Sequence, residues 1–448
     1  MKNRKITIKI YILLSLIISF LFFGNTINSK MGIIDDHTYF ASGVLSNPFT
    51  VWNNFINATE IKSFGNIERF RIIYDLINNI ETLIFRTNAI YWYLTNIFVF
   101  AFFTFTIFYL TSKNIQKPWS FLSAIYIISK PYFAYIFTRL GTAEVWTILG
   151  ISIYSLGFNS LYHKSKNKHK YKEWKEWLVM TIGSIICIGS KENFAFLGIL
   201  FILMIFILKC RNKLSKISII FSILLISINL FQITDIFIST QHQKIDFYKN
   251  STNIKTRINE TVSEVTTKEI APYTAVAISS TIIITFFYLI NKRNKKIKNN
   301  KETFLIPLIS IPILYIIFLF NLYIYNGTFY TSHRYAFPSV ITIQLTYLIV
   351  FNFLLNLQNI FNFKFSKTTT KIIFLIICFF LLKKIYLTYK TCKTISIANV
   401  NVTNEFQNNL KEIIEKIKEH PDNIIIFSSY NPYDFELLDS SKIYLRYY

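Results

Sequence analysis

The sequence predicts an all-α protein that crosses a membrane about eleven times. Hydrophobic residues make up 52% of its 448 residues and charged residues only 16%, a balance that soluble chains of this length do not show. Apolar runs of about 17–22 residues recur along the chain, and such a run crosses a hydrocarbon core of about 30 Å as a helix. The runs do not alternate in hydrophobicity with a period of two, which disfavours a membrane barrel.

The apolar runs alternate with loops and divide the chain into a membrane domain and a tail. We expect the runs at Ile6–Phe23, Ala89–Leu110, Trp119–Phe137, Val145–Leu161, Trp177–Gly189, Phe194–Leu208, Ile217–Ile236, Ala271–Ile290, Phe304–Tyr325, Ala336–Leu355 and Ile372–Tyr386. The short fifth and sixth runs are two helices or, alternatively, one kinked hairpin. Residues 1–387 make up the membrane domain, which includes large loops at 24–88 and 239–270, and residues 388–448 form the tail.

The placement of basic residues predicts the orientation of the chain. Four basic residues among the first nine place the N-terminus in the cytoplasm, because short basic segments stay inside. The N-terminus and the inside loops hold just over half of the 48 Lys and Arg residues. The same segments hold only three of the 24 acidic residues: Glu173, Glu176 and Glu302. Eleven crossings then place the C-terminus and the large loops outside a plasma or inner membrane.

The first run resembles a secretory signal but lacks a cleavage site. The residues that follow it, GNTINSK, hold no convincing small-x-small pattern, so we interpret the run as an uncleaved membrane helix. The net charge of +24 has a membrane explanation as well, since the basic loops meet anionic lipid headgroups and no nucleic-acid partner is implied. Lys383 and Lys384, at the outer end of the last run, depart from the charge trend, and snorkelling to the headgroups would accommodate them.

The tail combines a helix pattern with a strand pattern. The segment EFQNNLKEIIEKIKEH spaces its apolar residues on one helical face: Phe406, Leu410, Ile413, Ile414 and Ile417. The turn residues Pro421, Asp422 and Asn423 follow, and IIIFSSY then reads as a short strand. We therefore expect a small extracytoplasmic α/β cap, too short to be an independent enzyme.

Two adjacent carboxylates stand in the first outer loop, within GIIDDHTYFASG. Asp35 and Asp36 follow the first apolar run by about a dozen residues, where the chain has entered the outer aqueous side. A carboxylate pair raises the pKa of each member, binds a divalent cation through oxygen, or serves as a general base. The alternative is a solvated loop with ordinary acids.

Further ionisable residues stand at the outer ends of later helices. Lys130-Pro131 breaks the third run and Glu144 begins the next helix, while Lys191 lies in the connection GSKENF between the fifth and sixth runs. His333 and Arg334 lie between the ninth and tenth runs. Such residues indicate function when they converge. The alternatives are an interfacial ion pair of Lys191 with Glu192 and a headgroup anchor for Arg334.

This organisation resembles the GT-C superfamily, membrane glycosyltransferases that use polyprenyl-phosphate-linked sugars. Protein O-mannosyltransferases and the bacterial aminoarabinose transferase of lipid A belong to it. The shared features are the acidic pair and surface helices in the first outer loop, a Pro-broken third helix followed by R-x-x-x-x-E, and the K-E pair between two short helices. The resemblance covers most of the first 210 residues and thins after that.

The resemblance implies a role for each matching residue. Asp36 or Asp35 would deprotonate or orient the acceptor hydroxyl, and Glu144, with Asp35, would help to hold Mg or Mn in those members that use a metal. Arg334, with His333 or Lys191, would neutralise the phosphate that leaves. The donor would be a polyprenyl-phosphate sugar, and the acceptor a cell-surface glycan, lipid or protein.

Three other functions remain open from the sequence. An O-antigen or polysaccharide polymerase is also polytopic and acts outside on polyprenyl-linked glycans, but it relies on Arg-rich outer loops, whereas these loops are richer in acids. A transporter of lipid-linked glycans needs ionisable residues along the bundle centre and often an inverted repeat, and neither is evident. The third is a membrane scaffold without catalysis. The sequence names neither the sugar nor the acceptor.

Overall fold

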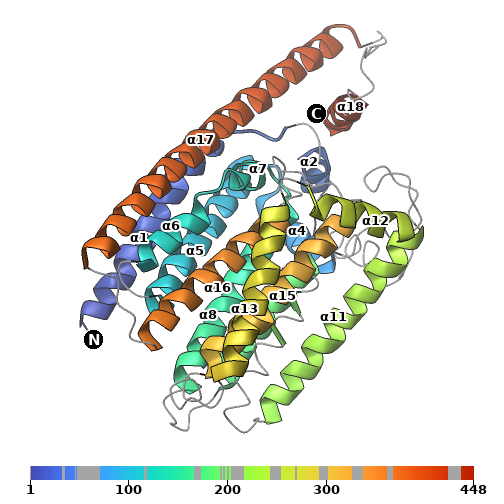
Figure 1. The fold of residues 1–448 in the computed structure, drawn as a ribbon. Helices are drawn as coiled ribbons and strands as arrows, with labels where there is room; N and C mark the ends of the chain where they lie inside the picture. The colour runs from blue at the N-terminus through green and yellow to red at the C-terminus, as the bar shows by residue number, and fades with distance from the viewer. Residues whose placement is uncertain are drawn as a thin grey trace.

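In a computed structural model of the protein, the described residues that form secondary structure are helical (Figure 1). The structure describes residues 2–32, 36–45, 47, 71–115, 119–165, 173–191, 194, 197–198, 201–202, 216–242, 254–267, 270–291, 301–324, 337–360, 367–421 and 435–447. They form 15 α-helices and one 3-10 helix, with no strand among them. The expected fold class is therefore confirmed at the level of an all-helical chain.

Six of the described helices are long and apolar enough to cross a membrane, and two shorter ones are apolar as well. The six candidate spans are Thr7–Asn28, Ala89–Asn114, Ala271–Ile290, Thr303–Tyr323, Phe337–Leu357 and Thr368–Glu419. The two shorter helices cover Trp119–Ile128 and Ile219–Thr234. The chain is thus a multi-pass membrane protein by the length and composition of its helices, and the count of eleven crossings stays a prediction.

The helices follow the predicted apolar runs and extend a few residues beyond them. They are α1 (Lys2–Phe23), α5 (Ala89–Asn114), α6 (Trp119–Ile128), α7 (Tyr132–Phe137), α8 (Ala143–Ser165), α9 (Trp174–Ser190), α11 (Lys216–His242), α13 (Ala271–Asn291), α15 (Lys301–Ile324) and α16 (Phe337–Ile360). Of the sixth run, only a few residues are described. The loops add α2 (Asp36–Leu45), α4 (Ile72–Phe85) and α12 (Ile254–Val265), and the 3-10 helix η1 (Gly24–Asn28) follows α1.

The third run breaks at Lys130-Pro131, as predicted. Pro131 has no N–H to donate to the carbonyl of Ile127, and the Lys130 N–H turns to Ile128, so the last carbonyls of α6 lose their helical donors. Gln344 of α16 replaces them, because its Nε2 lies 3.2 Å from the Tyr126 oxygen and 3.1 Å from the Ile127 oxygen. A polar side chain from another helix thus satisfies the break inside an apolar bundle.

Helices α8 and α9 pack backbone against backbone. A Cβ at Gly150 would lie 2.4 Å from the Cys187 nitrogen, and one at Gly183 would lie 2.4 Å from the Tyr154 nitrogen. Lipid tails are as apolar as side chains, so helices in a membrane associate by close packing rather than by the hydrophobic effect, and small residues permit it. The two glycines therefore determine how closely the start of α8 approaches the end of α9.

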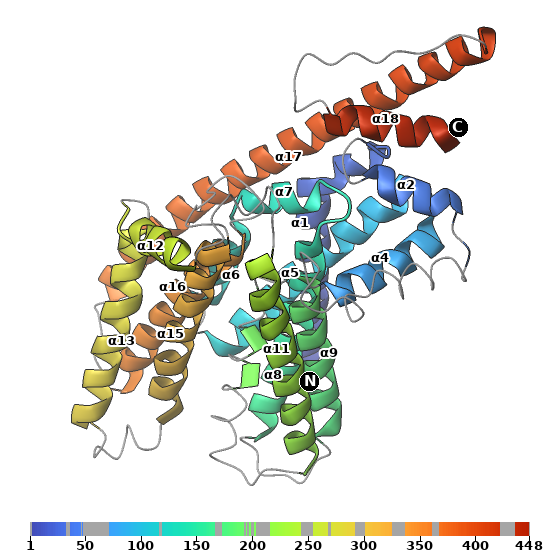
Figure 2. The ribbon, with the colours of Figure 1, turned by 90° about the vertical axis from the view of Figure 1, so that its right-hand side faces the viewer.

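The last long helix, α17, runs without interruption from Lys367 to Glu419, 53 residues. At 1.5 Å per residue it is roughly 80 Å long, and it reaches beyond the rest of the bundle (Figures 1 and 2). The expected start of the tail at residue 388 falls inside it, because no Gly or Pro occurs until Pro421 ends it. The predicted helix in the tail is confirmed as its last part. The predicted strand IIIFSSY lies outside the described residues, and α18 (Phe435–Tyr447) follows.

The two termini lie at opposite ends of the helix bundle (Figures 1 and 2). We call the end that carries α2, α7, α12 and α18 the upper end, because it is uppermost in Figure 1. The candidate residues that the structure describes belong to helices that begin or end there. If the N-terminus is cytoplasmic, the upper end is the extracytoplasmic one.

Candidate functional site

Asp36 is the first residue of α2 and is largely buried, with 8% of its surface exposed. Its Oδ2 accepts a hydrogen bond of 2.8 Å from the Gly32 N–H. A carboxylate in the first turn of a helix also interacts favourably with the helix dipole. Asp and Glu are rarely buried unless other groups compensate their charge, so the reading of Asp36 as an ordinary solvated acid is wrong.

The chain just before Asp36 is held by a row of polar side chains on α17. Asn399 donates to the Ser29 hydroxyl at 3.0 Å, Thr403 accepts from the Lys30 N–H at 3.1 Å, and Gln407 donates to the Met31 carbonyl at 2.7 Å. These three residues are four apart and share one helical face. Tyr444 of α18 completes the row by donating to the Gly32 carbonyl at 2.9 Å. We call these four residues the anchor row; they connect the C-terminal part of the chain to the acid of the first loop.

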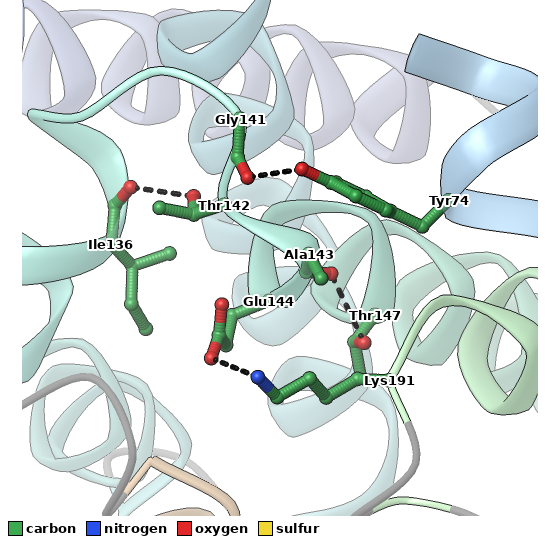
Figure 3. A network of polar contacts seen from close by, with 8 residues as sticks. All are labelled: Tyr74, Ile136, Gly141, Thr142, Ala143, Glu144, Thr147 and Lys191. Carbon is green, nitrogen blue, oxygen red and sulfur yellow. Dashed lines mark hydrogen bonds and ion pairs between the residues drawn. The ribbon is translucent and has the colours of Figure 1, made fainter. Parts of the chain in front are cut away.

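A chain of hydroxyl groups connects α2 to the turn that precedes α8. The Tyr74 hydroxyl of α4 donates to the Gly141 carbonyl at 2.5 Å (Figure 3) and lies 2.7 Å from the Tyr39 hydroxyl of α2. Because the proton of Tyr74 is used on Gly141, Tyr39 must donate to Tyr74. Asn78 donates in turn to Tyr39 at 3.3 Å. We refer to Asn78, Tyr39, Tyr74 and Gly141 as the tyrosine relay.

Gly141 meets two requirements of this turn that no other residue would meet. Its φ is +62°, in the left-handed region that favours glycine. A Cβ there would lie 2.0 Å from the Tyr39 hydroxyl oxygen. Thr142 closes the turn by donating to the Ile136 carbonyl at 2.9 Å (Figure 3). The turn is therefore closed around Tyr39 and delivers the chain directly into α8.

Glu144 and Lys191 form a buried ion pair where α8 begins and α9 ends. The Lys191 Nζ lies 3.1 Å from the Glu144 Oε1 (Figure 3), and the residues are 2% and 1% exposed. The close packing of α8 on α9 brings these two ends together. Gln232 of α11 steadies the end of α9, because its Nε2 donates to the Ile188 carbonyl. A buried pair of this kind is expensive to desolvate, so it is weak evidence for a role in stability alone.

Arg139 and Asp36 both lie within electrostatic range of the Tyr93 hydroxyl of α5. Tyr93 also accepts a hydrogen bond of 3.0 Å from Asn399. The carbonyl of Arg139 is held by Asn96, one turn further along α5, at 2.8 Å. The first-loop acid, the Arg-x-x-x-x-Glu turn and the anchor row therefore meet around the start of α5.

Helix α4 carries two carboxyl groups whose acidity is reduced by burial. Burial raises the pKa of Asp75 to about 6, against a smaller opposing effect from the Arg71 guanidinium. Burial alone raises the pKa of Glu81 to about 8. Glu81 is therefore mostly protonated at neutral pH. The helix that contributes Tyr74 to the relay thus carries a neutral acid on its buried side.

Three of the predicted site residues fall within the described part of the chain. Asp36, Glu144 and Lys191 all lie at helix ends, and Glu144 pairs with Lys191. The alternative for Lys191 named Glu192 as its ion-pair partner, and Glu192 lies outside the described residues. Asp35, His333 and Arg334 lie outside the described residues.

The described residues do not fit a metal site at Glu144. Its Oε1 faces the Lys191 ammonium, which takes the place that a cation would need. Within the described ranges, no three His, Cys, Asp or Glu side chains lie close enough to hold a metal. Asp35, the other expected ligand, is not among these residues. Glu144 is therefore placed to hold the Lys191 ammonium rather than Mg or Mn.

Sequence reasoning missed the tyrosine relay and the anchor row. Nothing in the sequence pairs Tyr39 with Tyr74, since their contact depends on how two loop helices pack. The sequence does contain a pattern that indicates the anchor row. Asn399, Thr403 and Gln407 are polar residues four positions apart on α17, beyond the end of its apolar run. Ser396, three residues before Asn399 and on the same helical face, donates to the Phe22 carbonyl at 3.3 Å.

Comparison with known proteins adds no relative: no family model, no curated protein and no solved structure matches the chain. The fold and the site define the class as a multi-pass helical membrane protein with a polar cluster at one end of its bundle.

Proposed function

We propose that this protein is a GT-C-like membrane glycosyltransferase that moves a sugar from a polyprenyl-phosphate carrier to an acceptor on the cell surface. In this proposal the chain crosses the membrane eleven times, its N-terminus is cytoplasmic, and the upper end faces outward. The acceptor is a glycan, a lipid or a protein. The observation that carries the proposal is Asp36, a buried carboxylate held in place by separate parts of the chain. Such an arrangement costs free energy and is retained where charge is used.

Asp36 acts as the general base in this proposal. Its carboxylate takes the proton of the acceptor hydroxyl while the hydroxyl oxygen forms a bond to the anomeric carbon of the sugar. The bond from that carbon to the phosphate oxygen breaks, and the carrier leaves as polyprenyl phosphate. The hydrogen bond from the Gly32 N–H to Oδ2 helps to orient the carboxylate for this step.

Lys191 supports the departure of the phosphate. Negative charge grows on the leaving oxygen, and a cation held in a buried site stabilises it without reorganisation. An ammonium group has three donors, so Lys191 binds a phosphate oxygen while it stays paired with Glu144. Glu144 thus holds the Lys191 side chain in position until the donor arrives. Arg334 and His333 remain proposed partners of the same phosphate.

Asp36→Asn is the direct test, because the asparagine keeps the acceptor for the Gly32 N–H and removes only the charge. Loss of a general base lowers a rate by about 10²–10⁴-fold. We expect cells in which the variant replaces the wild type to lose the sugar from their surface glycans, as measured by mass spectrometry, at normal protein levels. Asp35→Asn is the matched control and should retain more transfer.

The same measurement separates the rival functions. A gene deletion that removes a single sugar supports transfer, whereas shortened glycan chains support a polymerase. A carrier-linked glycan that accumulates inside supports a transporter. If both Asp variants transfer sugar at the wild-type level and at normal protein levels, the acidic pair has no catalytic role. The protein would then be interpreted as a membrane scaffold without catalysis.

A further inference from the structure

Lys130, in the break between α6 and α7, and Lys384 of α17 lie within electrostatic range of each other, and Lys383 precedes Lys384 in the sequence. Lys130 stands in the break, and Lys383 and Lys384 stand on α17, which packs against both short helices. Among the described residues, none of the three has an ion-pair partner. The Lys130 Nζ lies 5.3 Å from the centre of the Tyr126 ring, and the nearby Lys384 repels it electrostatically. The contact between α17 and the α6–α7 break, which we call the seam, therefore carries an excess of positive charge, and no acidic group of the described residues neutralises it.

The surroundings of these lysines are apolar and open to the outside of the bundle. Phe379 and Phe380, one turn before them on α17, are 68% and 60% exposed, and Leu382 and Leu387 are similarly exposed. On a membrane-spanning helix such a surface faces lipid tails. Charged groups on that surface are costly unless they reach a counter-charge.

The position of the lysines along α17 places them near lipid headgroups. Lys384 lies about 26 Å along the helix from Lys367, at 1.5 Å per residue. The hydrocarbon core is about 30 Å thick, so a helix that starts at the inner surface reaches the outer headgroup level near this point. A lipid phosphate is the negative charge available at that depth.

We propose that Lys130 and Lys384 form a binding site for the phosphate group of a membrane lipid at the seam between α17 and the α6–α7 break. The phosphate lies between the two ammonium groups and relieves their repulsion, and Lys383 adds a third positive charge. The tails of the lipid lie along the exposed Phe379 and Phe380. The site uses neither residue of the Glu144–Lys191 pair, and it does not depend on the proposed transferase activity.

Native mass spectrometry of the full-length protein, purified in a neutral detergent, tests this site. Phosphatidylglycerol, a polyprenyl phosphate and inorganic phosphate are titrated separately. We expect the wild type to retain at least one of the two lipids, and Lys130→Gln/Lys384→Gln to bind that lipid at least tenfold more weakly. The lipid that responds identifies the source of the phosphate.

Lys390→Gln/Lys393→Gln is the matched control. It removes the same total charge as the Lys130/Lys384 double variant, and Lys393 lies over the Tyr389 ring at 5.8 Å, much as Lys130 lies over Tyr126. Lipid retention by this control should equal that of the wild type. Lys384→Gln alone changes only an exposed side chain, so it folds and should show a smaller loss, while Lys130→Arg/Lys384→Arg should bind normally.

Three outcomes would overturn the site. The first is equal lipid retention by the wild type and the Lys130/Lys384 double variant. The second is an equal loss in the Lys390/Lys393 control, which would indicate a general effect of charge. The third is equal competition by inorganic phosphate, which would indicate a site for a soluble anion. None of these outcomes bears on sugar transfer, which is measured separately through Asp36.

Discussion

Two kinds of contact position the candidate site. The helix pair α8–α9 positions Glu144 and Lys191 by close backbone packing, whereas α17 positions the chain before Asp36 by side-chain hydrogen bonds. The pair meets backbone to backbone through glycines, and its ends hold Glu144 against Lys191. Helix α17 has a largely exposed apolar part and then holds the chain before Asp36 by side-chain hydrogen bonds. Close packing fails when any atom is added, whereas a row of hydrogen bonds weakens one bond at a time. The two kinds of contact should therefore respond very differently to substitution.

The largest loss of stability is expected at the end of the tightly packed pair. Lys191→Met leaves Glu144 buried without its ammonium partner, and breaking a buried ion pair costs about 3–5 kcal/mol. Thermal unfolding in detergent should show the loss. Lys191→Met/Glu144→Gln should recover much of it, since the remaining carboxamide carries no charge. A double variant as unstable as the single one would mean that packing, and not the pair, is responsible.

A somewhat smaller loss is expected at the glycine contact itself. A Cβ at Gly183 would lie 2.4 Å from the Tyr154 nitrogen and 2.8 Å from its Cα, so Gly183→Ala must push α8 and α9 apart, at a cost of about 1–3 kcal/mol. The control is Gly24→Ala, whose Cβ would meet only the Phe20 side chain at 3.6 Å. Its unfolding temperature should stay close to that of the wild type. Equal temperatures for both variants would contradict the close packing of the pair.

Helix α4, which packs on α9, should make stability depend on pH. The folded pKa of Glu81, about 8, lies above its usual 4.5, so the folded state binds this proton more tightly. The contribution of Glu81 to the free energy of unfolding is fully present below about pH 4.5. It is lost as the pH rises towards 8, by up to about 1.4 kcal/mol per pH unit.

Glu81→Gln should remove this loss in unfolding measurements between pH 6 and 8. Asp75, with a pKa of about 6, acts mainly below that interval, so Asp75→Asn is the control that keeps the slope. An unchanged slope in Glu81→Gln would mean that the buried carboxyl is already charged at neutral pH.

The smallest effects are expected in the anchor row. Gln407→Ala removes one hydrogen bond to the Met31 carbonyl, worth about 1 kcal/mol. Transfer should fall modestly, because the row positions Asp36 without touching the substrate, and Gln407→Ala/Asn399→Ala should lower it further. Lys411→Ala, an exposed change one turn along α17, is the control. If the double variant transfers sugar at the wild-type rate, the row is structural only.

The sequence determined the class, most helices and the positions of the candidate acids. Apolar runs, the Lys130-Pro131 break and the helical face around Leu410 are local patterns, and each reappears in the structure because hydrophobic period and proline chemistry act within a few residues. The length of α17 is also a local property of the sequence, because no Gly or Pro occurs in it before Pro421. The end of the apolar run had nevertheless predicted a boundary at residue 388.

The tertiary structure alone decided which polar groups meet. It pairs Lys191 with Glu144, buries Asp36 instead of solvating it, and brings Tyr39 onto Tyr74. Lys191 and Glu144 are 47 residues apart in the chain and Tyr39 and Tyr74 are 35 apart, so no local period encodes either contact. These contacts form because particular helix ends approach one another. Glycine contacts between α8 and α9 and hydrogen bonds from α17 determine that approach, since the hydrophobic effect does not drive helices together within lipid.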